Sequence, residues 1–111
     1  MYFIFAYFIN NKIAIKEFWS HITIQHSPTT IKLGYEPFIH IEHIRQSATI
    51  KEIRKLTNKE DDNDNILRTG DKAYIKLEFI LRPEYIKPEM KLIFREGKVK
   101  ATGKIINIDE L

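Results

Sequence analysis

The chain has 111 residues, of which 43% are hydrophobic and 30% are charged, and it carries a net charge of +3. Its length predicts one ordinary domain, which is too short for a multidomain enzyme. Its composition is typical of a packed chain and excludes a disordered one. Because the chain has no cysteine, it cannot form a disulfide, a thiolate metal site or a thiol nucleophile. A reducing compartment, the cytoplasm, fits this composition.

The positive charge is interrupted by one acidic segment. Residues 1–56 hold seven basic and four acidic residues, and residues 66–111 hold ten and seven, so each part carries +3. Residues 57–65 carry −3 and thereby offset a background of +6. A polyanion is therefore a candidate partner, although a charge of this size is also common on proteins that bind none.

The chain begins with an apolar run at residues 1–9. A membrane-spanning helix needs about 20 apolar residues, and neither a basic region nor a small-residue cleavage site accompanies the run. We therefore expect no membrane partner. Residues 1–16 are interpreted as an N-terminal strand or a linker from a preceding domain.

Six strands and no long helix are predicted from residue 18 onward. Isoleucine occurs 20 times, and β-branched side chains favour strands. The clearest alternation runs over 73–81, where Ala73, Ile75, Leu77, Phe79 and Leu81 share one face. The predicted strands cover residues 18–25, 35–43, 45–54, 73–81, 90–95 and 98–108. Gly97 is expected at the turn between the last two, and Gly103 at a bend.

An antiparallel sheet of this size is expected to close, because an open sheet would expose its edges. Residues 17–111 are therefore predicted to form one barrel or sandwich. Within it, residues 50–56 space their apolar side chains by three, as an amphipathic helix does; we interpret them as a strand that runs into a loop. The acidic segment at 57–65 is expected to be a mobile loop tip.

No pattern predicts catalysis. Ser20 or Ser47 with a histidine and an acid would supply the parts of a triad, but no G-x-S-x-G motif accompanies either serine. The paired carboxylates at 57–65 lie where mobility opposes the raised pKa of an acid catalyst. A solvated loop is the better interpretation of these acids.

Metal and nucleotide sites are also unsupported. His40 and His43 are three apart and so point to opposite faces of a strand, and residues 61–65 lack the glycine and distal glutamate of an EF-hand loop. Residues 58–61 fit the N-K-x-D pattern for guanine, but no phosphate-binding loop is present. We expect neither a metal nor another cofactor.

Basic residues gather in the last third of the chain. They are Arg82, Lys87, Lys91, Arg95, Lys98, Lys100 and Lys104. On the last predicted strand, Lys98, Lys100, Thr102 and Lys104 share the face opposite Val99, Ala101, Gly103 and Ile105. Two interpretations remain open: a solvated outer face, which composition by itself favours, or a surface that contacts phosphates.

Four blocks in order carry a family resemblance. They are H-x-P-T-T-I at 26–31 with Gly34-Tyr35 and I-R-Q-x-A-T-I at 44–50; L-R-T-G-D-K-A at 67–73; P-E-Y at 83–85; and F-R-E-G-x-x-K-A-x-G-x-I at 94–105. Over residues 17–108 the chain closely resembles the C-terminal β-barrel (domain III) of translational GTPases such as elongation factors Tu and 1-alpha, and most of all the GTP-binding protein 1 and 2 subfamily. The resemblance implies a six-stranded antiparallel Greek-key barrel without catalytic residues.

The resemblance also implies partners. The family uses this barrel to contact the T-stem backbone of aminoacyl-tRNA and to pack against the GTPase domain, and the ribosome is a further candidate partner. The tRNA-binding residues implied are Arg82, Gly97, Ser47, Arg95, Lys98 and Lys100. Phe38 replaces a glutamine that makes a contact in the bacterial factors. The alternative for Arg95 is an ion pair with Asp71 or Glu96 that fixes the turn.

The functional expectation is a non-catalytic barrel of a translation-factor-like GTP-binding protein. The parent family hydrolyses GTP, but its GTPase motifs are absent from these residues, so the chain is not expected to be an enzyme. The alternatives are a stand-alone protein-interaction barrel that uses residues 1–8, or a remnant of a truncated translational GTPase.

Overall fold

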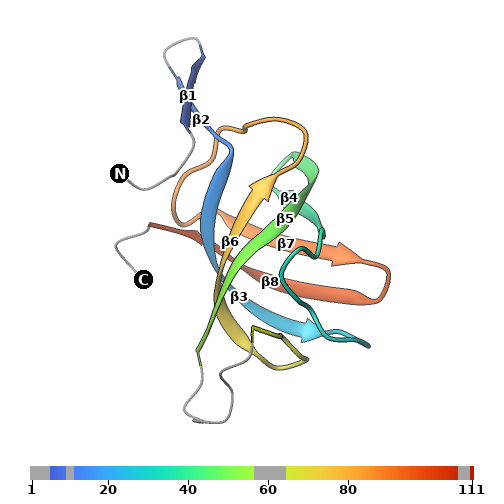
Figure 1. The fold of residues 1–111 in the computed structure, drawn as a ribbon. Helices are drawn as coiled ribbons and strands as arrows, with labels where there is room; N and C mark the ends of the chain where they lie inside the picture. The colour runs from blue at the N-terminus through green and yellow to red at the C-terminus, as the bar shows by residue number, and fades with distance from the viewer. Residues whose placement is uncertain (1–5, 10–11, 57–64, 108–110) are drawn as a thin grey trace.

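The computed structural model describes residues 6–9, 12–56, 65–107 and 111, which form eight strands and no helix. The strands are β1 (Ala6–Ile9), β2 (Lys12–Ile15), β3 (Glu17–His26), β4 (Phe38–Ile41), β5 (Ile44–Lys55), β6 (Lys72–Phe79), β7 (Lys91–Glu96) and β8 (Val99–Ile106). The last six close a barrel in the order β3-β6-β5-β4-β7-β8, with every neighbouring pair antiparallel (Figure 1). β4, β5 and β6 are consecutive neighbours, and the next strand, β7, returns to pair with β4, which is a Greek-key arrangement. The predicted all-β, six-stranded antiparallel Greek-key barrel is confirmed.

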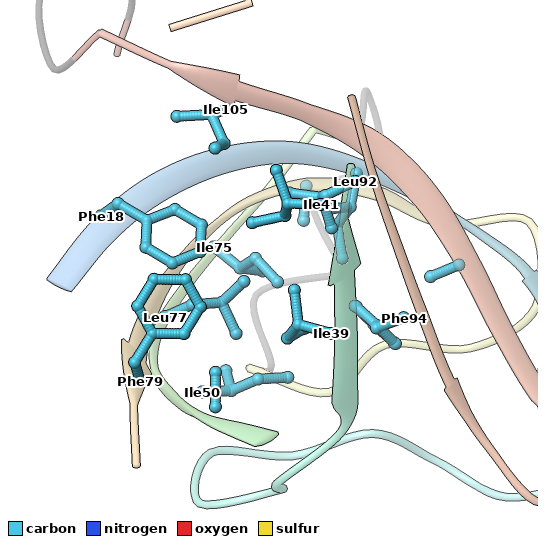
Figure 2. Packing of buried hydrophobic residues seen from close by; sticks show 14 of the residues in the cluster. Phe18, Ile39, Ile41, Ile50, Ile75, Leu77, Phe79, Leu92, Phe94 and Ile105 are labelled. Carbon is cyan, nitrogen blue, oxygen red and sulfur yellow. The ribbon is translucent and has the colours of Figure 1, made fainter. Parts of the chain in front are cut away.

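The barrel is closed around an interior of isoleucine, leucine and phenylalanine side chains. Alternate residues of each strand point inward, as Ala73, Ile75, Leu77 and Phe79 of β6 do. Phe18 and Phe79 lie side by side at one end of the interior, with ring centroids 5.0 Å apart and planes tilted by 39° (Figure 2). The alternation predicted for the last strand is confirmed, because Val99, Ala101 and Ile105 are buried and Lys98 is exposed.

The helix-like spacing at residues 50–56 arises from a β-bulge in β5. Ile50 pairs with Leu77, but Glu52 pairs with Lys76, so Lys51 is one extra residue on this strand. The extra residue shifts the alternation, which places both Ile50 and Ile53 inside the barrel although they are three apart. The expectation of a strand is confirmed, and the bulge explains the helix-like spacing.

Four predicted strand ends are wrong, and two of them, at residues 43 and 108, lie two residues beyond the observed ends at Ile41 and Ile106. The strand expected from residue 35 begins at Phe38; Pro37 still accepts a hydrogen bond from Ala48 at 3.1 Å, but its missing N–H interrupts the ladder. The strand expected through residue 81 ends at Phe79. Leu81, predicted to share the inward face, is 69% exposed, because its N–H bonds to the Gln46 side chain at 3.0 Å.

The outward-facing Trp19 of β3 is buried as well. The Arg54 guanidinium lies 5.0 Å and the Lys76 ammonium 5.8 Å from its ring centroid. Lys76 also pairs with the buried Glu17 at 3.2 Å. Long basic side chains therefore cover the ring from outside, as their apolar stems permit.

Gly103 permits a close approach of β8 to β3. A Cβ atom at this position would lie 2.0 Å from the carbonyl oxygen of His21, which is far inside van der Waals contact. The bend expected at Gly103 is thus a position inside β8 where only glycine lets the two backbones pair.

β1 and β2 form a separate two-stranded antiparallel sheet that stands off the barrel next to the start of β3 (Figure 1). Ile15, at the end of β2, is buried and bonds through its backbone to Glu84 in both directions, at 2.7 and 2.9 Å. The predictions for residues 1–5 and for the acidic segment at 57–64 fall outside the described residues. The division at residue 16 stays a prediction, and β3 begins at Glu17.

Candidate nucleic-acid interface

Three of the residues singled out in the sequence lie in one row across the outside of the barrel, together with Phe38. Ser47 of β5 pairs with Phe38 of β4, Phe38 pairs with Arg95 of β7, and Arg95 pairs with Lys100 of β8. Neighbouring strands are about 4.8 Å apart, so the row spans roughly 15 Å. None of these four side chains is buried. We call Ser47, Phe38, Arg95 and Lys100 the outer row.

Arg82 lies beside this row in the loop of residues 80–84, which follows β6. Ile80 donates its N–H to the Ser47 carbonyl at 3.1 Å, so the loop leaves β6 next to the Ser47 end of the row. The Arg82 side chain is 61% exposed, and its Nε lies 3.7 Å from Glu84 Oε2. A guanidinium paired at one edge keeps further N–H groups for another acceptor.

The loop that carries Arg82 is held by a buried glutamine. Gln46 of β5 is 1% exposed. Its Nε2 donates to the Arg82 carbonyl at 3.0 Å and to Glu84 Oε2 at 2.6 Å. Its Oε1 accepts from the N–H groups of Leu81 at 3.0 Å and Arg82 at 3.4 Å. Together with the Ile15–Glu84 pairing, these bonds fix the backbone of Arg82 from two sides.

Gly97 and Lys98 form the two-residue turn between β7 and β8, where Glu96 pairs with Val99. Gly97 has φ +57° and Lys98 has no positive φ, a pattern typical of a type II′ turn with glycine first. The turn therefore presents the exposed Gly97 and Lys98 at the tip of a hairpin, beyond the Arg95–Lys100 end of the outer row.

The alternative role for Arg95 is not found. Asp71 instead accepts the Arg68 N–H at 2.8 Å and pairs with Lys55 at 3.6 Å. Gly70, with φ +91°, donates to the Ile24 carbonyl at 2.7 Å. Gly70 and Asp71 lie in a turn closed by the Asp71 N–H and the Arg68 carbonyl at 3.0 Å, and Arg95 pairs with neither Asp71 nor Glu96. The Arg95 guanidinium is therefore available at the surface.

A groove of about 700 Å³ opens next to the outer row. Its walls are His40 of β4, Glu42 of the β4–β5 turn, Arg45 of β5, and Lys91 and Ile93 of β7. Residues 87–90 close its remaining side, and Lys104 pairs there with Glu89 at 3.0 Å. His40 faces Arg45 on one strand and Ile93 on the other. On β4, β5 and β7 the groove therefore lies two residues along from the outer row, on the same outward face.

Two backbone positions at the groove are unusual. Glu42 has φ +52° and Glu89 has φ +77°, and these are the only non-glycine residues with positive φ in the described ranges. Glu42 is supported by Arg45, whose Nη1 donates to the carbonyls of Glu42 and Ile44. The Pro88–Glu89 pair occupies the centre of a turn closed by the Met90 N–H and the Lys87 carbonyl at 3.3 Å. Both turns hold conformations that side chains disfavour.

Burial and two guanidinium groups act on His40. Partial burial, then the positive charges of Arg45 and Arg95, lower the pKa of His40 below its usual value of 6.5. Each cause disfavours the imidazolium. Burial and then the Glu96 carboxylate raise the pKa of Tyr35 above 10.0, and its buried hydroxyl has no hydrogen-bond partner in the part of the chain described. Tyr35 also packs against the hydrophobic core.

The sequence reasoning missed Gln46, Glu84 and the groove. A signal for Gln46 was present: it stands between Ile44 and Ala48 on the inward face of β5, and a buried polar side chain needs hydrogen-bond partners. Nothing in the sequence indicated the groove, because it forms where one turn and one loop meet across strands β4 and β7.

Other kinds of site are not seen in the described ranges. No cluster of three or more histidine or acidic side chains is placed to hold a metal ion there. Within the same ranges, no helix has the length and apolar character needed to cross a membrane.

The closed six-stranded antiparallel barrel defines the fold class of the chain. No family model matches the chain. A crystal structure of Sup35 complexed with GDP superimposes with a TM-score of 0.72 over 85% of this chain and 26% of that one, at 19% sequence identity. This likeness concerns the fold alone.

Sequence relatives identify the particular lineage. GTP-binding protein 1 of Xenopus laevis is 43% identical over 98 residues, and human GTP-binding protein 2 is 31% identical over 94. Elongation factor 1-alpha of Archaeoglobus fulgidus is 26% identical over 110 residues. These matches cover 85–89% of this chain but 14%, 14% and 26% of the relatives. The chain belongs with the C-terminal β-barrel domains of translational GTPases, and it corresponds to a small, non-GTPase part of such proteins.

Proposed function

We propose that the barrel binds the sugar–phosphate backbone of a tRNA stem through its outer row, the β7–β8 turn and Arg82. The single observation that carries this proposal is the register that aligns Ser47, Phe38, Arg95 and Lys100 across four adjacent strands. An RNA helix presents phosphates and 2′-hydroxyls rather than readable base edges. A row of cations with a hydroxyl and an accessible glycine turn suits such a surface.

The contacts divide by chemistry. Arg82 at one end and Lys98 and Lys100 at the other supply charge for phosphates; Arg82 pairs with Glu84 through Nε at 3.7 Å and keeps its other N–H groups for a phosphate. The Gly97 backbone and the Ser47 hydroxyl are suited to a ribose hydroxyl. Phe38 replaces a hydrogen-bonding side chain with an apolar ring, so this position supports contact by packing and not by a polar bond.

A second contact surface is proposed for the GTPase domain of the parent protein. Ile80 and Leu81 are 43% and 69% exposed on the loop beside Arg82, and Tyr85 is also exposed. Neighbouring exposed apolar side chains favour a protein partner. Such a barrel would act within translation in the cytoplasm and would contribute binding, with GTP hydrolysis carried out by another domain.

The test is binding of tRNA to wild-type protein and to single-charge variants at several salt concentrations. Arg82→Ala and Lys100→Ala should each weaken binding about threefold to fivefold and equally for different tRNAs, and each should lower the salt slope by about one. Lys72→Ala is the matched control, because β6 lies opposite β7 in the barrel order. Absence of binding at low salt, or an equal loss in Lys72→Ala, would refute the proposal.

A further inference from the structure

The groove beside the outer row combines positive charge with free donors. Arg45, Lys87 and Lys91 line it together with Glu42 and Glu89, and the Glu89 carboxylate is already engaged by Lys104 at 3.0 Å. Lys87 and Lys91 have no acidic partner in the described part of the chain. Arg45 uses Nη1 for the turn carbonyls and retains its other N–H groups. Three cationic side chains therefore face the Glu42 carboxylate and a Glu89 carboxylate already paired with Lys104, and this excess of positive charge favours an anionic ligand.

Flat and apolar groups adjoin these donors. The His40 ring meets the Phe38 ring edge-on, with centroids 5.2 Å apart and planes at 79°. Phe38 is 40% exposed, and Ile93, which pairs with His40, is 37% exposed. An aromatic pair left open beside three cations has the composition of surfaces that bind unpaired nucleotides, where bases stack on rings and phosphates contact lysine and arginine.

The groove also continues the proposed RNA surface. Phe38 and His40 are successive outward residues of β4, and Ser47 and Arg45 are their partners on β5. A nucleic-acid strand that leaves the outer row along β4 would therefore enter the groove. The volume of about 700 Å³ lies in the usual range for small-ligand sites, which is ample for one nucleotide.

We propose that this groove binds an unpaired nucleotide of the RNA held by the outer row, with the base against Phe38 and His40 and its phosphate against Lys87, Lys91 and Arg45. This inference rests on the proposed function, since it assumes an RNA ligand. An acidic peptide would satisfy the lysines but would leave the aromatic pair without a flat partner, so the nucleotide is the ligand that uses both features.

A short blunt RNA duplex and the same duplex with a single-stranded extension test the proposal. The extended RNA should bind the wild-type protein about fivefold tighter or more, as one stacked base contributes. The double variant Lys87→Ala/Lys91→Ala should lose this advantage and bind the blunt duplex as the wild type does. Lys72→Ala should keep the advantage. Nitrogen–proton NMR spectra of each variant verify the fold.

The outcomes separate the two proposals. Equal affinity for the two RNAs, or an advantage that survives in the double variant, overturns the groove assignment and leaves duplex binding intact. Failure of both RNAs to bind overturns both. His40 provides a second readout: a phosphate in the groove should raise its pKa in an NMR titration with the extended RNA but not with the blunt duplex. An unchanged pKa, or tighter binding of an acidic peptide, contradicts the assignment.

Discussion

Gln46 forms hydrogen bonds to the backbone of Arg82 from inside the barrel. Its Nε2 donates to the Arg82 carbonyl at 3.0 Å, and its Oε1 accepts from the Arg82 N–H at 3.4 Å. A completely buried amide of β5 thus sets the position of an exposed guanidinium in a loop far along the chain. The same Nε2 also meets Glu84 Oε2 at 2.6 Å, the carboxylate oxygen closest to Arg82 Nε. The interior and the proposed RNA surface are linked through this one side chain.

Replacing Gln46 by Met should destabilise the barrel and loosen the Arg82 loop. The substitution keeps the size of the side chain but removes the Gln46 bonds to the backbone N–H groups of Leu81 and Arg82 and to the Arg82 carbonyl, at a cost of about 2–3 kcal/mol in the free energy of unfolding. Urea denaturation measures this cost. Gln25→Met is the control, because among the described residues the exposed Gln25 side chain bonds only to Thr102, so this substitution should change stability by less than about 0.5 kcal/mol. Equal losses in the two variants would contradict a special role for Gln46.

Replacing Gly103 by Ala should be severely destabilising. The new Cβ would stand 2.0 Å from the His21 carbonyl oxygen, so β3 and β8 would have to separate; overpacking of this kind costs about 1–3 kcal/mol or more. Gly70→Ala is the comparison, since its Cβ would meet nothing within 4 Å and the cost arises only from φ +91°. In thermal unfolding, Gly103→Ala should have a lower midpoint temperature than Gly70→Ala. The reverse order would show that β8 adjusts easily.

The Glu89→Gly variant should be more stable than the Glu89→Ala variant. Both substitutions remove the carboxylate that pairs with Lys104, so their difference isolates the backbone at φ +77°. Glycine tolerates this conformation, whereas alanine bears a penalty of about 1 kcal/mol. Chemical denaturation of the two variants measures the difference. Equal stabilities would mean that the Pro88–Glu89 turn relaxes to a negative φ.

His40 should titrate below its unfolded pKa of about 6.5. Because the folded state binds this proton less tightly than the unfolded chain, His40 favours folding above the unfolded pKa and loses this contribution as pH falls through the folded pKa. The stability of His40→Asn should therefore depend less on pH than that of the wild type between about pH 5 and 7. NMR titration of the His40 ring verifies the direction. A pKa above 6.5 would contradict the effect of Arg45 and Arg95.

The sequence was sufficient for the barrel because the signals were local. Alternation along 73–79 and the turn at Gly97 each reflect a few neighbouring residues, and four ordered blocks carried the family resemblance. Local patterns did not predict features that depend on hydrogen-bond or strand partners distant in sequence. The exposure of Leu81 follows from Gln46, and the spacing of Ile50 and Ile53 follows from a bulge against β6.

The candidate site was foreseen in its residues but not in its arrangement. Ser47, Arg95 and Lys100 were named individually, and only the register through Phe38 brings them into one row. The sequence could not exclude an ion pair between Arg95 and Asp71, because Lys55, the actual partner of Asp71, lies on a different strand. The groove depends on two turns whose backbone conformations, at Glu42 and Glu89, are not those usual for glutamate.

Titration of isotope-labelled protein with unlabelled tRNA, followed by amide chemical shifts, tests the central claim most directly. Binding through the outer row predicts the largest shifts at Ser47, Phe38 and Arg95, at the Gly97 turn and in the loop of Arg82, with residues in the middle of β6 unchanged. These shifts should shrink as salt is added. Shifts that centre on β3 and β6, or no shifts at low salt, would contradict the account.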